Sequence, residues 1–431
     1  YNNYLTCIYV SMYVNPSPTL HSVSLFSLFR NQHIKSSSQL MLSSRSAARL
    51  FLLTTSFHIQ RAAPSFVRAT FGVGRTEASK LIATMTTETN SSGSNTNTGA
   101  DKKGSYVRLA SKHRHAVSQL PGGDFPSESG RYHLHVALAC PWACGTLAAL
   151  RLKGLDDAIS HSVVHPTWGK TNLEDDADQH FGWVYRRTGD DPLPNPLGYG
   201  SNRCDEALIP DAITNARSIR EVYELCGDFQ GPFTTPLLFD KKTERIVSNE
   251  STDILKMLNS EFNSFAKNPE VDLYPEDIED DLVSLNDSIV YPKVNNGVYR
   301  CGFARSQDAY NTAVVELFAA LDTLEGMLAK KRYLGGRHFT WLDLRLFMTL
   351  VRFDPVYTTY FKTNQRRIAD YPNLLGFVRD VYSIAPVRSS INMDHIKVHY
   401  YTSHPTLNTF GIIPIGNGPD LEIVDHGREE M

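Results

Sequence analysis

The chain has 431 residues, enough for two domains and an extension, and 41% hydrophobic and 21% charged residues are ordinary values for a globular protein. The formal net charge of −3 is uneven, because residues 1–76 hold seven basic and no acidic residues, which leaves −10 for residues 77–431. An acidic body argues against a nucleic-acid partner, and no apolar stretch is long enough for a convincing membrane span. Six scattered cysteines without zinc-site spacing exclude a disulfide scaffold and predict reduced thiols and no metal.

The composition of residues 1–104 predicts a leader and a linker rather than a folded domain. The sequence starts at Tyr1, so we expect a fragment or an over-extended gene model, with Met41 or Met85 as the start. Residues 41–76 are rich in Arg and Ser and lack acids, as organelle transit peptides do. A start at Met41 predicts a mitochondrial or plastid protein, and a start at Met85 a cytoplasmic one. The polar run 86–104 predicts a disordered linker.

The folded part is expected from about residue 105, and the stretch 132–155 has its strongest pattern. An alternating apolar run predicts a buried strand over 132–139, and Pro141 suits the first turn of the helix that follows. Further along, the patterns predict a strand at 159–165, a helix at 211–226, a β-hairpin at 233–248 and a helix at 249–260. The long irregular stretch 166–210 is of the kind that is usually functional or disordered. The order β-α-β-α-β-β-α is the thioredoxin-like arrangement, expected over residues 105–265.

From about residue 274 onward strand signals nearly vanish. Apolar side chains between residues 314 and 328 follow helical spacing, and residues 341–353 and 372–384 predict further helices. Thr340 and Asp343 form a capping-box-like start for the first of these. The fold class is therefore α/β plus all-α, with an all-helical second domain over residues 266–431.

Cys140 lies where the predicted strand gives way to the predicted helix. Free N–H groups and the helix dipole at such an N-terminus stabilise a thiolate, the reactive form of cysteine. A buried cysteine that only packs is an equally good interpretation of the position alone.

Six runs of the sequence stand out, and they are RYHLHVALACPWA, GWVY at 182–185, IVSNES at 246–251, VNNGVYRCGFA at 294–304, LVRFDPVY at 350–357 and DHIKVHYY at 394–401. The architecture resembles that of glutathione transferases, and these runs closely resemble one subgroup, the glutathionyl-hydroquinone reductases or Xi class. The resemblance covers about residues 102–415.

The resemblance implies a glutathione-dependent reduction of glutathionyl-hydroquinones, with glutathione as co-substrate and no metal. Cys140 is then the nucleophile and forms a mixed disulfide with glutathione, which a second glutathione releases as oxidised glutathione. Such thiol exchange needs a single reactive cysteine, which agrees with the lack of a C-x-x-C pair. The family also implies a homodimer.

The resemblance implies a glutathione site built from Trp183, Thr235, the cis Pro236, Glu250 and Ser251. Glu250 would accept from the ligand amine, while the Ser251 hydroxyl and the helix N-terminus would bind its carboxylate, although Ser251 also suits simple helix capping. The family usually has Val at 235, but the contact comes from the backbone.

In the helical domain, Tyr291, Tyr299 and Tyr400 are the expected aromatic pocket for the quinol ring, with Tyr299 or Tyr400 as a proton donor. His395 and His399 have i,i+4 spacing but no third ligand in view, so we interpret both as structural.

The chain departs from the family pattern at two places. The family commonly has His-Arg where this chain has Cys144 and Gly145, and Cys144 is expected to pack rather than to resolve a disulfide. The family also has Arg where this chain has Pro232. The loss of this arginine either weakens glutathione binding or is made good by Arg186, Arg187 or Arg217, and the sequence does not decide between these.

Two other interpretations remain at this point. An omega-like thioltransferase or dehydroascorbate reductase would use the same cysteine on other substrates. A non-catalytic ligand carrier would share the fold, but a carrier needs no thiolate.

Overall fold

The computed structural model describes residues 98–431 except 121, 424 and 425, so the predicted leader and its two start sites lie outside the described residues. The chain enters the fold earlier than predicted, because β1 (Thr98–Ala100) pairs antiparallel with β2 (Tyr106–Arg108). The expected linker up to residue 104 is therefore wrong from residue 98. The Asp101 carboxylate accepts from the N–H groups of Lys103 (2.8 Å) and Ser105 (2.9 Å), so polar residues that suggested disorder close a turn instead.

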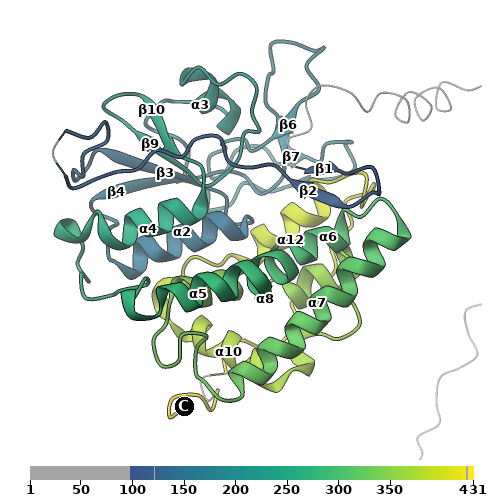
Figure 1. The fold of residues 1–431 in the computed structure, drawn as a ribbon. Coiled ribbons are helices and arrows are strands. Elements are labelled where there is room, and N and C mark those ends of the chain that lie inside the picture. Colours follow the sequence, from purple (N-terminus) through teal and green to yellow (C-terminus); the bar gives the residue numbers. More distant parts are fainter. Residues whose placement is uncertain (1–97, 121, 424–425) are drawn as a thin grey trace, which may run out of the picture. The chain divides into compact units, whose positions relative to one another are not determined.

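The predicted thioredoxin-like order is confirmed. A four-stranded sheet has the order β10-β9-β3-β4, with β3 and β4 parallel and the other neighbours antiparallel. Helix α3 lies on one face of this sheet, and α2 and α4 lie on the other (Figure 1). The elements in chain order are β3 (Tyr132–Val136), α2 (Pro141–Leu152), β4 (Ile159–Val163), α3 (Ile219–Leu225), β9 (Leu237–Asp240), β10 (Arg245–Ser248) and α4 (Ser251–Ser260).

Strand β3 divides its side chains between the two faces, as its period of two requires. Tyr132, Leu134 and Val136 belong to the large core that α2 and α4 share with the helical domain. His133 and His135 point the other way, and the His135 ring meets Tyr185 of the smaller core around α3.

Several of the predicted boundaries moved. The strand expected over 132–139 ends at Val136, and the helix expected over 211–226 begins only at Ile219. The helical prediction is wrong for 211–218 because the Asp211 carboxylate accepts from the N–H of Ile213 (2.9 Å) and forms a turn, and Ser218 then caps α3. Pro236 lies just before β9 rather than inside a strand.

The long stretch 166–210 is a loop that contains two short pairs of antiparallel strands. These are β5 (Gly169–Lys170) with β6 (Phe181–Gly182) and β7 (Leu193–Pro194) with β8 (Ser201–Asn202).

The second domain is helical, as predicted. Its α-helices are α5 (Glu279–Leu285), α6 (Gly297–Gly302), α7 (Gln307–Leu328), α8 (Trp341–Leu350), α9 (Thr358–Tyr360), α10 (Pro372–Ser383), α11 (Ala385–Arg388) and α12 (Met393–Thr402). Two π-helical segments, η3 (Asn286–Asn295) and η4 (Phe353–Tyr357), and two 3-10 turns, η2 (Glu276–Ile278) and η5 (Ile368–Asp370), complete it. A further 3-10 turn, η1 (Asn263–Phe265), ends the first domain.

The predicted start of α8 is confirmed, since the Thr340 N–H donates to the Asp343 carboxylate at 3.0 Å. No helix in the described part of the chain combines the length and the hydrophobicity that crossing a membrane requires.

Candidate active site

Cys140 is the N-cap residue of α2, with extended backbone angles, and Pro141 follows it in the first turn. Its side chain makes no capping hydrogen bond to the helix, and the first turn holds no acidic residue that would repel a thiolate. The thiol is half-buried, and Sγ lies 3.5 Å from the carbonyl oxygen of Thr235. The sulfur is therefore accessible and lies at the positive end of a helix.

A cavity of about 110 Å³ opens beside Cys140, between the sheet domain and the helical domain. Most of its wall is aromatic, and the elements that supply the wall are far apart in the sequence. Its lining residues are Tyr106, Arg108, Cys140, Pro141, Trp142, Trp168, Trp183, Thr234, Thr235, Tyr299, Phe303, His399, Tyr400 and His404. A flat aromatic ligand suits such a wall.

Tyr299 and Tyr400 both line this cavity, and their hydroxyl oxygens are 2.6 Å apart. The Tyr400 hydroxyl also lies 3.0 Å from that of Tyr357, a buried residue that does not line the cavity. Burial raises the pKa of Tyr299 and of Tyr400 well above the usual value. Both phenols therefore keep their protons at neutral pH and can donate one.

Tyr291 lies elsewhere than expected. It does not line the cavity, and its ring packs against the indole of Trp142 at 6.1 Å. The Arg345 guanidinium lies 4.8 Å from the Tyr291 ring and 5.0 Å from the Trp142 ring. Tyr291 thus supports a wall of the cavity rather than facing a ligand.

Trp183 lines the cavity, as expected, and its indole stacks on the His399 ring at 4.4 Å. Trp168 meets Trp183 edge to face at 5.9 Å. The His399 ring is held by a hydrogen bond between Nδ1 and the Pro166 carbonyl, and burial lowers its pKa well below the usual value. His399, expected to be only structural, is therefore a neutral ring in the wall of the site.

His395 agrees with its structural interpretation, since it bonds Asp205 at 3.0 Å. It does not line the cavity.

The predicted glutathione residues other than Trp183 lie near the N-termini of α2 and α4. The Thr235-Pro236 bond is cis, as expected, and Thr235 faces Cys140. Glu250, rather than Ser251, is the N-cap of α4. Its carboxylate accepts hydrogen bonds from the Thr252 N–H (3.2 Å) and from the Ser111 hydroxyl (2.9 Å). Ser251 lines a second, water-sized cavity of about 10 Å³ that shares Pro141 and Trp142 with the larger one.

The three arginines expected to replace the missing family arginine lie outside the Cys140 cavity. Arg186, Arg187 and Arg217 do not line the cavity, and Arg217 pairs with Glu221 at 2.8 Å. The arginine that does line it is Arg108 of β2, whose guanidinium lies 4.5 Å from the Trp142 ring centre. The sequence held no signal for Arg108, since it precedes the first recognisable strand of the sheet.

Cys144 is a free, fully buried thiol. Its Sγ lies 3.0 Å from the Leu138 carbonyl and 3.1 Å from a guanidinium nitrogen of Arg352. Burial raises the pKa of Cys144, and the guanidinium offsets this only in part. A thiol that keeps its proton is a poor nucleophile, which supports the packing role over a resolving role.

Arg352 is a site residue that sequence reasoning missed. It is completely buried, and its Nε lies 3.3 Å from the carbonyl of Ala139, the residue before Cys140. It also donates to the Met348 carbonyl at 2.7 Å. The helical domain therefore holds the turn that carries Cys140. Its position inside the matched run LVRFDPVY was the available signal.

Two family descriptions match the chain, "Glutathione S-transferase, N-terminal domain" over residues 139–261 and "Glutathione S-transferase, C-terminal domain" over residues 307–380. Together with the thioredoxin-like sheet, the helical domain and the cysteine between them, these matches place the chain in the glutathione transferase superfamily.

Two curated relatives narrow this class. The chain is 42% identical to the glutathionyl-hydroquinone reductase YqjG of Escherichia coli, over 76% of this chain and 93% of the relative. It is 40% identical to the glutathionyl-hydroquinone reductase PcpF of Sphingobium chlorophenolicum, over 74% of this chain and 91% of the relative.

Solved structures agree with these relatives. The glutathione transferase Xi of Phanerochaete chrysosporium matches with 42% identity and a TM-score of 0.63, over 72% of this chain and 97% of that one. A glutathione-bound structure of YqjG matches with 39% identity and a TM-score of 0.64, over 74% and 96%. The chain belongs to the glutathionyl-hydroquinone reductase family, the Xi class of glutathione transferases.

Proposed function

We propose that this protein reduces glutathionyl-hydroquinones to hydroquinones at the expense of glutathione. The observation that carries the proposal is the position of Cys140, a half-buried thiol at a helix N-terminus that faces an aromatic cavity with two protonated phenols in its wall. Relatives that are 40–42% identical bear the name of this activity.

In the first step, the Cys140 thiolate attacks the sulfur of the glutathionyl group. A new S–S bond forms while the bond between that sulfur and the quinol ring carbon breaks, and its electron pair goes to the ring carbon. Tyr299 or Tyr400 supplies the proton that this carbon needs, and hydroquinone leaves. Cys140 then carries glutathione as a mixed disulfide.

In the second step, the thiolate of a second glutathione attacks the glutathione sulfur of the mixed disulfide. Oxidised glutathione leaves and the Cys140 thiolate is restored. The glutathione thiol loses one proton when it forms its thiolate, and the ring carbon gains one proton. The number of protons is therefore the same before and after the cycle. One reactive thiol suffices, which agrees with the protonated state of Cys144.

Glutathione binding draws on the surfaces around Cys140. The backbone of Thr235, before the cis Pro236, pairs with the cysteinyl part of glutathione, and Trp183 covers it. Glu250 and Ser251 receive the γ-glutamyl end at the N-terminus of α4. The Arg108 guanidinium supplies a positive charge at the same cavity.

The test is mass spectrometry of the full chain after incubation with a glutathionyl-hydroquinone, beside Cys140→Ser and Cys226→Ser. Cys226 is a matched control because it is also half-buried but lies outside the cavity, and burial raises its pKa to about 11. We expect a glutathione-sized adduct and hydroquinone release in the wild type and Cys226→Ser, and neither in Cys140→Ser.

Two results would contradict the proposal. A folded wild-type chain without adduct or turnover would favour a ligand carrier. Turnover of dehydroascorbate or protein mixed disulfides, without activity on glutathionyl-hydroquinones, would favour an omega-like enzyme. Three more distant relatives, 32–35% identical, bear omega-like names.

We further propose import into a mitochondrion or plastid when residues 41–76 are translated, a cytoplasmic location when translation starts at Met85, and a homodimer. The acid-free, Arg-rich composition supports the first, and the family supports the last. Fluorescent fusions from each start and light scattering of the purified chain test these points.

A further inference from the structure

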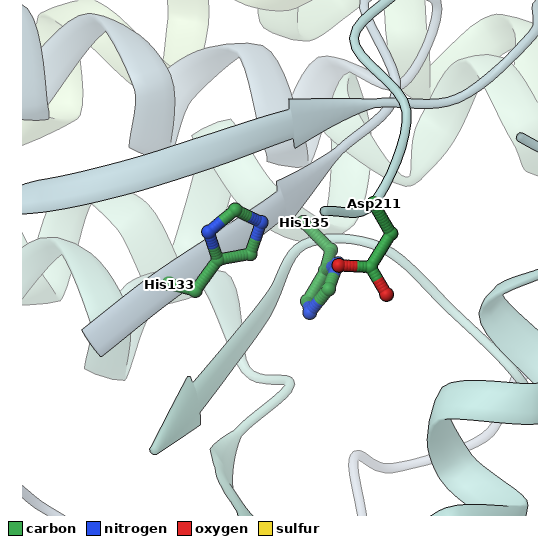
Figure 2. Close-up of side chains that lie close together, drawn as sticks. All are labelled: His133, His135 and Asp211. Carbon is green, nitrogen blue, oxygen red and sulfur yellow. The ribbon is translucent and has the colours of Figure 1, made fainter. Parts of the chain in front are cut away.

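A second group of chemistry-bearing side chains lies on the α3 face of the sheet, and none of them lines the Cys140 cavity. It consists of His133 and His135 of β3 and of Asp211, which directly follows the long loop 166–210. One ring nitrogen of each histidine and one carboxylate oxygen of Asp211 lie within 4.8 Å of one another. Figure 2 shows the Asp211 carboxylate beside the His135 ring, with the His133 ring on the same strand.

Each imidazole in this group has one satisfied and one unsatisfied nitrogen. Nδ1 of His133 lies 2.7 Å from the Ser160 hydroxyl, and Nδ1 of His135 lies 2.7 Å from the Tyr185 hydroxyl. Both Nε2 atoms are buried and have no hydrogen-bond partner within the described part of the chain. The side chains themselves are 3% and 0% exposed. Since buried polar atoms are rarely left unpaired, two orphan nitrogens in one place indicate a ligand.

We propose that His133, His135 and Asp211 bind a divalent first-row transition metal, with Zn²⁺ as its occupant. Imidazole nitrogens with a single carboxylate favour such an ion over Ca²⁺ or Mg²⁺, which prefer oxygen ligands. The hydrogen bonds at Nδ1 hold the rings in place, as the outer partners of metal-binding histidines commonly do.

In this proposal the metal acts on the position of a loop and takes no part in the thiol exchange at Cys140. Metal–ligand bonds of about 2.0–2.2 Å bring three ligands closer together than the present 4.8 Å limit, so binding draws Asp211 toward β3. Asp211 directly follows the loop that carries Trp168 and Trp183. The metal would thus add to the two backbone hydrogen bonds between Val163 and Ile209 that already join the end of this loop to β4.

The experiment uses the full chain, stripped with a chelator and titrated with Co²⁺ as a spectroscopic probe. We expect visible d–d absorption that saturates at one equivalent, and a rise of about 2–5 °C in the unfolding midpoint with excess Zn²⁺. Both effects should be lost in His133→Asn and in Asp211→Asn. The second variant keeps an oxygen that accepts from Ile213, so it preserves the local turn.

Two controls exclude other binding sites. His161→Asn removes a histidine that is on neighbouring β4 but pairs in register with Leu134, which points to the opposite face. It should bind Co²⁺ normally. Cys140→Ser should also keep the absorption, because the proposed site contains no sulfur.

The proposal is overturned by any of three results. Absorption that survives in Asp211→Asn would place the metal elsewhere, and absorption lost in Cys140→Ser would place it on the reactive thiol. A wild-type chain that binds no Co²⁺, with a midpoint that Zn²⁺ does not move, would show that a buried water satisfies the two nitrogens instead.

Discussion

The Tyr400 hydroxyl has two hydrogen-bond partners, the hydroxyls of Tyr299 and Tyr357. Removing each partner in turn tests whether Tyr299 is a proton donor, with the Tyr357 variant as its control. Tyr299→Phe and Tyr357→Phe each remove one phenol that bonds Tyr400, at 2.6 Å and 3.0 Å. In either variant Tyr400 keeps its other partner, so no buried hydroxyl is left unpaired. Each change should therefore lower the free energy of unfolding by a similar amount, about 1 kcal/mol.

The two variants should differ sharply in catalysis. Tyr299 lines the cavity, whereas Tyr357 does not. If Tyr299 protonates the ring carbon, its loss should slow hydroquinone release by about 10²–10⁴-fold, the usual contribution of a positioned acid. Tyr357→Phe should stay within about fivefold of the wild type, which corresponds to about 1 kcal/mol.

The assay is single-turnover release of hydroquinone, followed by a separate measurement in which glutathione attacks the preformed mixed disulfide. The second step adds no proton to carbon, so Tyr299→Phe should leave it nearly unchanged. Equal losses in both variants would refute the reasoning, and a normal release rate in Tyr299→Phe would remove Tyr299 as the donor and leave Tyr400.

Three further predictions concern the surroundings of the site. Arg352→Met should lower the free energy of unfolding by about 1–3 kcal/mol in urea titrations, because buried carbonyl groups lose a hydrogen-bond donor. The control Arg367→Met removes only an exposed ion pair and should have little effect. Burial lowers the pKa of His180 to about 4, so between pH 6.5 and 4 the unfolded chain takes up a proton that the folded chain does not. His180 alone should therefore reduce the free energy of unfolding by up to about 1.4 kcal/mol for each unit that the pH is lowered in that window. Urea titrations of His180→Gln should show a correspondingly shallower pH dependence, and an unchanged one would show that the folded ring is solvated. Trp183→Phe should raise the KM for glutathione about tenfold with little change in kcat, and steady-state kinetics that show an unchanged KM would remove Trp183 from the binding site.

Local patterns were sufficient to predict most of the fold. The alternation in 132–136 defined a strand, Pro141 defined a helix start, and the Thr340–Asp343 box defined another, because each depends on neighbours within one or two turns. The errors lie where side chains bond the backbone locally. The Asp101 carboxylate closes a turn where we predicted a linker, and the Asp211 carboxylate forms a turn where we predicted the start of a helix.

The site followed the same division. The sequence by itself determined that Cys140 begins a helix and that Trp183, Tyr299 and Tyr400 belong with it, since a helix N-terminus is a local feature and the matched runs carry these residues. The tertiary structure decided that Arg108 and His399 line the cavity and that Tyr291 does not. It also brought His133 and His135 to Asp211, from which they are separated by more than seventy residues. Such contacts depend on how β3 pairs and where the long loop returns, and no local pattern encodes either.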